Sequence, residues 1–190
     1  MIDEKASPEL LPHKEELVAR IREQIEYQEV QAEEARERAD MELPRAAWAA
    51  ELARVRYVLR AYLRARLHKI ERHVMAVLDD PRLKARLSAR ELDHAQEYFV
   101  LLGGHLKAAV ASRLPPAFSS LVRQAAAHPD KDMVPAPKLD SHVFCRVAAD
   151  LGAVEVDSDG SLAEFAAGDL YVVRYRPIRD LVASGEVHLL

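Results

Sequence analysis

Cysteine, glycine and aromatic residues are scarce in this sequence. The one cysteine, Cys145, cannot form an internal disulfide, which is typical of a protein in a reducing compartment such as the cytosol or nucleus. Six glycines and 6% aromatic residues stand beside abundant alanine, arginine, leucine and glutamate, a composition that favours helix. A hydrophobic fraction of 49% still allows a packed core and argues against global disorder.

Long hydrophobic runs and an excess of positive charge are also missing. No apolar run approaches the roughly 20 residues needed to span a membrane, and residues 1–14 carry no apolar core of signal-peptide type. The formal net charge is −4, whereas a dedicated nucleic-acid-binding domain is usually basic. We therefore expect a soluble intracellular protein with no membrane partner.

The sequence has no motif typical of catalysis or of cofactor binding. Gly-x-Ser-x-Gly, the Walker glycine loop and the dinucleotide fingerprint do not occur. Cys145 follows Phe144 in an alternating, strand-like run, which favours a buried small hydrophobic residue over a catalytic thiol. The sequence therefore predicts no enzyme activity, no catalytic residue and no cofactor.

Two short motifs resemble metal sites without completing one. Glu91-x-x-His94 has the spacing found in carboxylate-bridged di-iron bundles, but such bundles need a second copy and further glutamates. Residues 157–160 begin like a calcium loop, but Gly168 occupies the position of the bidentate glutamate. We expect an exposed helical turn at the first motif, a hairpin turn at the second, and no metal at either.

Two hydrophobic periods divide the chain. Apolar residues recur at helical spacing to about residue 128 and alternate as in strands after about residue 138. The prolines at 129, 135 and 137 prevent a helix from continuing between these regions. The sequence thus predicts a mainly α protein, with an N-terminal bundle of long helices at residues 1–128, a proline-rich linker at 129–137 and a small β-rich domain with one short helix at 138–190.

The apolar spacing in the first domain predicts four helices, at residues 12–43, 48–77, 88–110 and 115–126. Pro44 is expected to end the first of them. Ser88 and Glu91 have the capping-box spacing at the start of the third. The adjacent glycines at 103 and 104 weaken the third helix and indicate a bend or a close helix contact there.

The tail predicts strands at residues 143–147, 153–156, 170–175 and 187–190, with a turn at 157–160 and a short helix at 177–184 ended by Gly185. About fifty residues make a marginal core. We therefore expect this domain to pack against something else.

The helix at 48–77 carries a run of cations, namely Arg54, Arg56, Arg60, Arg64, Arg66, Lys69 and Arg72. At about 100° per residue they surround the helix, whereas a helix that docks on a phosphate backbone gathers its cations on one face. Arg66 falls in the middle of the apolar stripe, where an unpaired guanidinium would cost several kcal/mol. We expect Arg66 to pair with a carboxylate or backbone carbonyls in a helix–helix or protein–protein contact, with nucleic-acid binding and a solvated surface as the alternatives.

Several stretches resemble one known family. Residues 54–71, RVRYVLRAYLRARLHKIE, are similar to the signature of the SLD-five subunit family of GINS. The tail adds LDSHVF at 139–144, RY at 174–175 and LVASGEVHLL at 181–190, and PELL at 8–11 also matches. The resemblance runs in order from about residue 8 to the end of the sequence.

This resemblance implies a non-catalytic scaffold subunit of the heterotetrameric GINS complex in the nucleus. Its implied partners are the three other, Psf-type GINS subunits, the MCM ring and a cell-division-cycle partner, which together form the replicative helicase of eukaryotes for initiation and elongation of DNA replication. It also implies a helical A domain and a small β-rich B domain that packs against neighbouring subunits, with DNA contact at most indirect or weak. The alternative is a nucleic-acid-binding module that uses the basic helix from Arg54 to Arg72.

The residues that we expect at a subunit interface or in a structural role lie on the basic helix and in the tail. They are Arg56, Tyr57, Arg60, Tyr62, Arg64, Arg66, Leu67, Phe144, Val187, Leu189 and Leu190.

Overall fold

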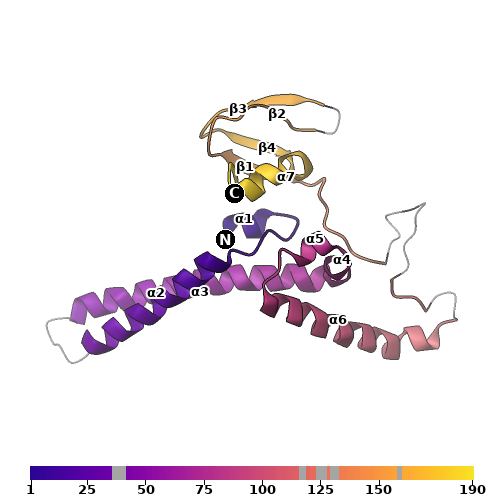
Figure 1. Ribbon diagram of the computed structural model, residues 1–190, viewed down its shortest axis with the longest axis horizontal. Helices are drawn as coiled ribbons and strands as arrows, with labels where there is room; N and C mark the ends of the chain where they lie inside the picture. The colour runs from indigo at the N-terminus through magenta and orange to yellow at the C-terminus, as the bar shows by residue number, and fades with distance from the viewer. Residues whose placement is uncertain (36–41, 116–118, 123–127, 129–132, 158–159) are drawn as a thin grey trace. The chain divides into compact units, whose positions relative to one another are not determined.

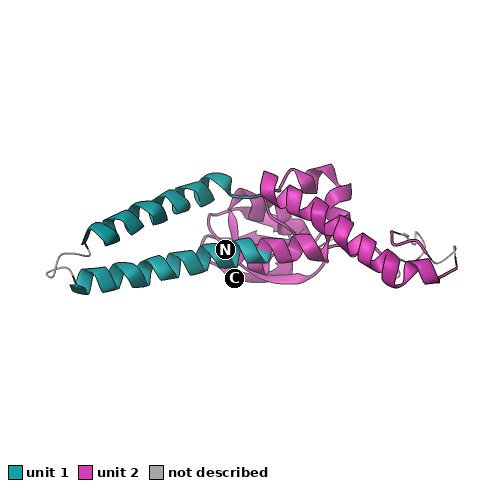
Figure 2. Ribbon diagram, turned by 90° about the horizontal axis from the view of Figure 1, so that it is seen from below, with its two compact units in different colours: residues 1, 13–65 teal, residues 2–12, 66–190 magenta. Residues whose placement is uncertain are grey.

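The computed structural model describes residues 1–35, 42–115, 119–122, 128, 133–157 and 160–190. Its contacts divide the chain into two compact units, which Figure 2 shows in different colours. Unit 1 holds Met1 and residues 13–65, and unit 2 holds residues 2–12 and 66–190. The elements labelled in Figure 1 confirm the predicted fold class, a mainly helical part followed by a small strand-rich part.

Unit 1 is built from two helices. These are α2 (Glu15–Glu34) and the portion of α3 (Glu42–Arg72) up to residue 65, which lie side by side. Val18 of α2 and Leu52 and Tyr62 of α3 are buried. The backbone N–H of Lys14 donates to Tyr62 Oη at 3.3 Å, which ties the start of α2 to α3. Most other side chains of the pair remain exposed, as expected for helices with one neighbour.

The predicted end of the first helix is wrong. α2 ends at Glu34 rather than Leu43, and Pro44 lies in the first turn of α3 instead of stopping the helix before it. Proline is tolerated in a first turn because its missing N–H would have no partner there. A proline therefore marks a helix boundary in a sequence without saying on which side the helix lies.

Unit 2 contains the end of α3 and the remaining helices, which are α1 (Ile2–Ala6), α4 (Val74–Asp79), α5 (Pro81–Lys84), α6 (Ala89–Ala109), a 3-10 turn (Ala111–Arg113) and α7 (Tyr175–Ser184). The helix predicted at 48–77 breaks at His73, where φ is −121° and ψ is 27°. The break allows Val74 to pack in a small core with Leu10, Ile70 and Ala95.

α6 begins as predicted. Ser88 Oγ accepts the backbone N–H of Glu91, and the Glu91 carboxylate accepts the backbone N–H of Ser88, which completes the capping box. A Cβ built on either glycine at 103 or 104 meets no atom within 4 Å. The close helix contact predicted at these glycines is therefore not present within the described part of the chain.

The predicted fourth helix falls largely outside the described residues. Of residues 115–126, the structure describes 115 and 119–122, and none of these is helical. Residues 133–137 of the predicted linker have no regular structure, and residues 129–132 lie outside the described part. No helix among the described residues is both long and apolar enough to cross a membrane.

The strand-rich part holds a three-stranded sheet and a hairpin. Its strands are β1 (His142–Val147), β2 (Gly152–Glu155), β3 (Leu162–Phe165), β4 (Leu170–Arg174) and β5 (Val187–Leu189). The sheet has the antiparallel order β4-β1-β5, and β2 pairs with β3. Side chains of β1, β4 and β5 alternate, so that Cys145, Val173 and Leu189 join one core with Ile178 and Val182 of α7. Cys145 is buried, which confirms the prediction that it is a small hydrophobic residue of the core.

The sequence did not predict β3, a four-residue strand without strong alternation, or α5, a four-residue helix. α1 contacts β5, and Asp3 Oδ1 accepts the backbone N–H of Leu189 at 2.8 Å. α1 therefore depends on contacts with residues almost at the other end of the chain. The contact units place residues 2–12 with residues 66–190, while the domain boundaries expected from the sequence remain a prediction.

Candidate subunit interface

Arg66 lies near the end of α3 and has no exposed surface. Its guanidinium makes a bidentate contact with Glu91, at 2.7 Å from Nε and 3.0 Å from Nη2. Nη1 donates to Glu4 Oε2 at 3.0 Å and to the carbonyl of Leu11 at 2.6 Å, and Nη2 also donates to the carbonyl of Arg86 at 2.9 Å. These bonds use all five N–H donors of the side chain. The prediction that Arg66 pairs with a carboxylate or with backbone carbonyls is confirmed, and it pairs with both kinds of acceptor inside the chain.

Glu91 has two tasks in this arrangement. It completes the capping box of α6 with Ser88 and it neutralises Arg66. His94, the other residue of the Glu-x-x-His motif, pairs with Glu71 at 3.1 Å. Among the described residues no group of three or more His, Cys, Asp or Glu side chains could hold a metal ion. The motif therefore serves helix capping and ion pairing in this fold.

Lys69 follows Arg66 by one turn and meets the same N-terminal segment. Its Nζ donates to the carbonyl oxygens of Glu4 and Glu9, the latter at 2.8 Å, and to Glu4 Oε1 at 3.0 Å. Burial lowers the pKa of Lys69, and the nearby Glu4 carboxylate opposes that shift. Because an ammonium has three donors, the three acceptors satisfy it completely.

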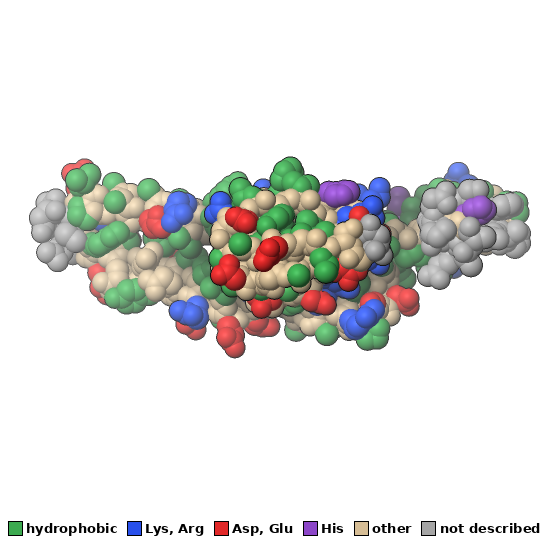
Figure 3. All heavy atoms as spheres, turned by 90° about the horizontal axis from the view of Figure 1, so that it is seen from above, with side chains coloured by type: hydrophobic (Ala, Val, Ile, Leu, Met, Phe, Trp, Pro, Cys, Tyr) green, Lys and Arg blue, Asp and Glu red, His purple; other side chains and the backbone are tan. Residues whose placement is uncertain are grey.

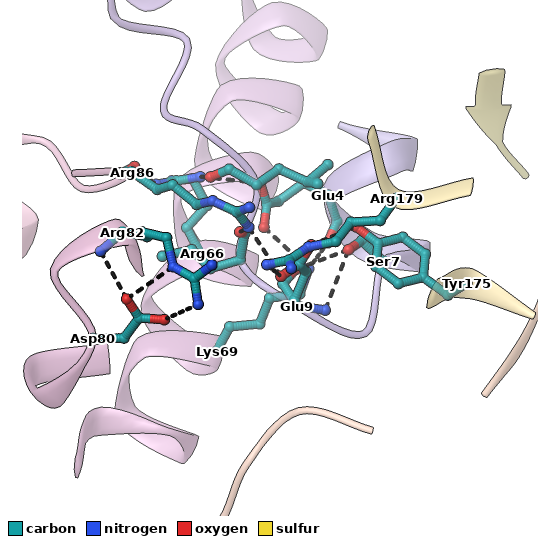
Figure 4. A network of polar contacts seen from close by, with 12 residues as sticks. Glu4, Ser7, Glu9, Arg66, Lys69, Asp80, Arg82, Arg86, Tyr175 and Arg179 are labelled. Carbon is teal, nitrogen blue, oxygen red and sulfur yellow. Dashed lines mark hydrogen bonds and ion pairs between the residues drawn. The ribbon is translucent and has the colours of Figure 1, made fainter. Parts of the chain in front are cut away.

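Glu9 is 2% exposed, and its carboxylate collects donors from two parts of unit 2 (Figure 4). Tyr175 Oη donates to its carboxylate at 3.0 Å, Arg179 makes a bidentate pair at 2.6 Å for both bonds, and Arg86 Nη1 lies 3.0 Å away. Tyr175 and Arg179 belong to α7, and Arg86 belongs to the connection between α5 and α6. We call Glu9, Arg86, Tyr175 and Arg179 the Glu9 cluster.

Two donors of the Glu9 cluster, Tyr175 and Arg179, have raised pKa values. Burial raises the pKa of Tyr175 well above its usual value, and the Glu9 carboxylate adds to that effect, so the phenol remains a donor. The hydrogen bond to Glu9 raises the pKa of Arg179. The N-terminal segment from Ile2 to Pro12 thus joins α7 to the helices of unit 2 through buried, charge-assisted hydrogen bonds.

The other predicted residues of α3 divide by exposure. Tyr62 is buried, Leu67 and Arg56 are half-buried, and Arg56 pairs with Glu29 of α2. Tyr57, at 69% exposed, shares one exposed side of the helix with Arg60 and Arg64, because steps of three and four residues return to the same side. We call Tyr57, Arg60 and Arg64 the α3 patch.

The basic run of α3 is largely neutralised within the chain. Arg54 makes a bidentate contact with Glu51, Arg56 pairs with Glu29, and Arg66 and Lys69 are committed to buried acceptors. The guanidiniums of the α3 patch have no ion-pair partner within 4.0 Å among the residues that the structure describes. The structure therefore separates cations that hold the fold from cations that face solvent.

The predicted tail residues also fall into two groups. Val187 and Leu189 are buried in the core of the strand-rich part, so they hold the fold. Phe144 and Leu190 are 65% and 50% exposed on the opposite face of the sheet. Figure 3 shows that hydrophobic side chains reach the surface of this part, some of them beside acidic ones.

Leu170 and Val172 were missed by the sequence reasoning, although they are 60% and 55% exposed on the same face as Phe144. Alternation within the predicted strand could have placed them on one side. Choosing which side faces solvent required the register of β4 against β1. Whether any of these exposed residues contacts another subunit stays a prediction.

Two families match this chain. Residues 19–109 match the family described as GINS complex protein helical bundle domain, and residues 137–190 match the family described as DNA replication complex GINS protein SLD5 C-terminus. The resemblance drawn from the residues of the basic helix and the tail is thereby confirmed.

The relatives match over nearly their full length. The chain is 34% identical to DNA replication complex GINS protein SLD5 of Arabidopsis thaliana, over 99% of this chain and 86% of that protein. It is 34% identical to the protein of the same name from Homo sapiens, over 100% of this chain and 85% of that protein. It is 26% identical to the protein of the same name from Dictyostelium discoideum, over 100% of this chain and 87% of that protein.

Proposed function

Because the chain belongs to the SLD5 family of the GINS DNA replication complex, we propose that it is a non-catalytic scaffold subunit of the heterotetramer. In this role it binds the three other GINS subunits in the nucleus. The assembled complex acts with the MCM ring and its cell-division-cycle partner in the replicative helicase, during initiation and elongation of DNA replication. The chain needs no cofactor for this role.

One observation supports the proposal. The buried charged groups find their partners within the chain, whereas apolar and aromatic side chains remain at the surface. Inside the chain Arg66 pairs with Glu4, and Glu9 pairs with Arg86 and Arg179. Tyr57 and Phe144 remain exposed, although burying such a side chain is typically favourable by about 1.5–3 kcal/mol. Tyrosine and arginine, which make up the α3 patch, are also enriched at the centres of protein interfaces.

Co-expression with the three other GINS subunits tests this proposal. A stoichiometric heterotetramer is expected by size-exclusion chromatography with light scattering. Substituting Tyr57→Ala together with Arg60→Ala is expected to weaken assembly at least tenfold, because these are two of the three residues of the α3 patch. Leu43→Ala, an exposed apolar position away from the patch, is the matched control. A stable monomer that does not bind the other subunits would refute the scaffold role.

A nucleic-acid-binding module on the basic helix is the second candidate, and the exposed Arg60 and Arg64 are what favour it. It predicts affinity for DNA that falls steeply with salt, because each neutralised phosphate releases counterions. The ion pairs of Arg54 and Arg56 and the burial of Arg66 leave few cations for such a surface. Absence of DNA binding by the isolated chain at low salt would remove this candidate.

The proposed domain organisation is a helical domain at residues 1–128, a linker at 129–137 and a strand-rich domain at 138–190. Deleting residues 138–190 is expected to leave the long helices α2, α3 and α6 folded, although α1 loses its contacts with β5, and to weaken incorporation into the heterotetramer. Far-UV circular dichroism and co-purification measure the two effects separately. An unfolded remainder would contradict the boundary.

A further inference from the structure

The three-stranded sheet has an apolar row on the face that points away from the core. Phe144 and Val172 are register partners on β1 and β4, and Leu190 donates its backbone N–H to the carbonyl of Phe144 at 3.0 Å. The three side chains therefore lie next to one another across all three strands. Each is at least half exposed, and Leu170 continues the row along β4. We call Leu170, Val172, Phe144 and Leu190 the outer row.

The ionisable residues on the outer face of the three strands are of basic types, and two of them lie beside an acidic group from outside these strands. Along β1, His142 and Arg146 flank Phe144 at two residues on either side, on the same face. The other ionisable residues on this face of the strands are Arg174 and His188. Arg174 Nε lies 3.3 Å from Asp157, and His188 Nδ1 lies 3.7 Å from Asp3. Within the described part of the chain, Arg146 has no acidic group within ion-pair distance.

We propose that this outer face binds an amphipathic segment of a partner protein, with its apolar side chains on the outer row and a carboxylate on Arg146. The inference rests on the proposed scaffold function and specifies the chemistry of one contact. Burial of Phe144 and its neighbours would supply the hydrophobic contribution. A partner carboxylate would fix the register, because an arginine fork accepts a carboxylate in a defined orientation.

Two other occupants fit the face less well. A second copy of this chain would bring Arg146 close to the same arginine of the other copy, and such like charges oppose association. Surfaces that bind single-stranded nucleic acid stack successive bases on several aromatic side chains. Phe144 is the one Phe, Tyr or Trp residue among the outward-facing positions of the three strands, and its neighbours in the outer row are aliphatic. Charge and composition both favour an acidic amphipathic protein segment.

Site-specific photocrosslinking in the reconstituted four-subunit complex tests the identity of the occupant. The full chain carries p-benzoylphenylalanine in place of Phe144, and mass spectrometry identifies the crosslinked peptide. The expected peptide belongs to a partner subunit and has Asp or Glu among apolar residues. The matched control carries the same probe in place of Leu162, which is 68% exposed on β3, outside the outer face. This control is not expected to crosslink the same peptide.

Charge reversal tests the role of Arg146. Arg146→Glu is expected to weaken assembly at least tenfold and to abolish the crosslink, while replacing the partner's acidic residue with lysine restores both. Lys138→Glu, an exposed position outside the strands, should leave assembly unchanged. Unchanged far-UV circular dichroism of Arg146→Glu would show that the sheet remains folded.

The outcomes separate this inference from the proposed function. If the wild-type chain does not assemble with the other subunits, the scaffold function fails and the inference fails with it. If the wild-type complex forms but Arg146→Glu assembles equally well, the inference alone is overturned. It is also overturned by a crosslink to a second copy of the chain, to a peptide without acidic residues, or to a fluorescein-labelled oligothymidylate added to the complex.

Discussion

Arg66 holds a positive charge where no water reaches it, and the surrounding groups make that position tolerable. Two carboxylates and two carbonyl oxygens occupy every donor of the guanidinium. The acceptors come from two segments that are far apart in the sequence, residues 4 and 11 in one and residues 86 and 91 in the other. A single side chain thus connects the N-terminal segment to the start of α6.

Removal of this side chain should be far more damaging than removal of an exposed arginine on the same helix. Arg66→Leu leaves Glu4 and Glu91 buried without their cation, and breaking a buried pair in this way costs about 3–5 kcal/mol. Arg54, whose side chain is 69% exposed, pairs with Glu51 at the surface, so Arg54→Leu should change the free energy of unfolding little. Urea unfolding of both variants measures the difference. Equal loss of stability would contradict the assigned faces of α3.

His73 should make stability depend on pH. It is 9% exposed at the break between α3 and α4, and its Nδ1 lies 3.2 Å from the carbonyl of Pro135. Burial lowers its pKa below the ordinary value of 6.5, and the contact with Pro135 opposes the shift. As pH falls below 6.5, the unfolded state takes up the proton before the folded state does, so stability is full above that pH and declines below it. The decline ends once the folded state is also protonated.

Denaturant unfolding at pH 7.5 and pH 5 measures this effect. The wild-type chain is expected to lose more stability between the two pH values than His73→Gln, which cannot titrate. His105→Gln, at an exposed position on α6, should keep the wild-type dependence. If His73→Gln loses as much unfolding free energy between the two pH values as the wild-type chain does, other groups cause the acid sensitivity.

At the scale of elements, α6 carries two glycines that lower its stability, although no neighbouring atom in the described part of the chain requires glycine there. Gly103 and Gly104 are helical, with open space around the position of a Cβ. Alanine at either position should raise the free energy of unfolding by about 0.5–1 kcal/mol, because glycine loses more backbone entropy in a helix. Gly185→Ala is the opposing control, since its φ of 86° lies in the left-handed region and alanine there should lower stability. Urea unfolding that shows no gain for either α6 variant would contradict this account.

Local chemistry made the element types of this chain predictable. The capping-box spacing of Ser88 and Glu91 predicted the start of α6, and the alternation around Cys145 predicted β1. The break at His73 gave no such sign, because the apolar spacing continues through Val74 and Val77. What decides that break is the packing of Val74 against Leu10 and Ala95, which the helical period alone does not encode.

Only those features of the candidate site that depend on the spacing within one helix were predictable from the sequence. The stripe on α3 placed Arg66 among apolar residues and so required a partner for its charge. It could not name Glu4, which lies 62 residues away along the chain. Similarly, the tail motif selected Val187 and Leu189 along with Phe144, and only the sheet register assigned the first two to the core.

At the scale of the whole molecule, Glu9 determines whether unit 2 behaves as one body. Its carboxylate is shared by α7 and by the connection between α5 and α6, which are far apart in the sequence. Glu9→Gln removes the negative charge and leaves Arg86 and Arg179 facing each other without it. Loss of a buried carboxylate partner should destabilise unit 2 by about 3–5 kcal/mol.

Native-state hydrogen exchange of the full chain shows where that loss falls. Amides of α7 and of the start of α6 are expected to lose protection together in Glu9→Gln, because both segments depend on the same carboxylate. Glu155→Gln, an exposed position on β2, should leave protection unchanged in both segments. If α7 loses protection while the start of α6 keeps it, Glu9 anchors one segment and does not couple the two.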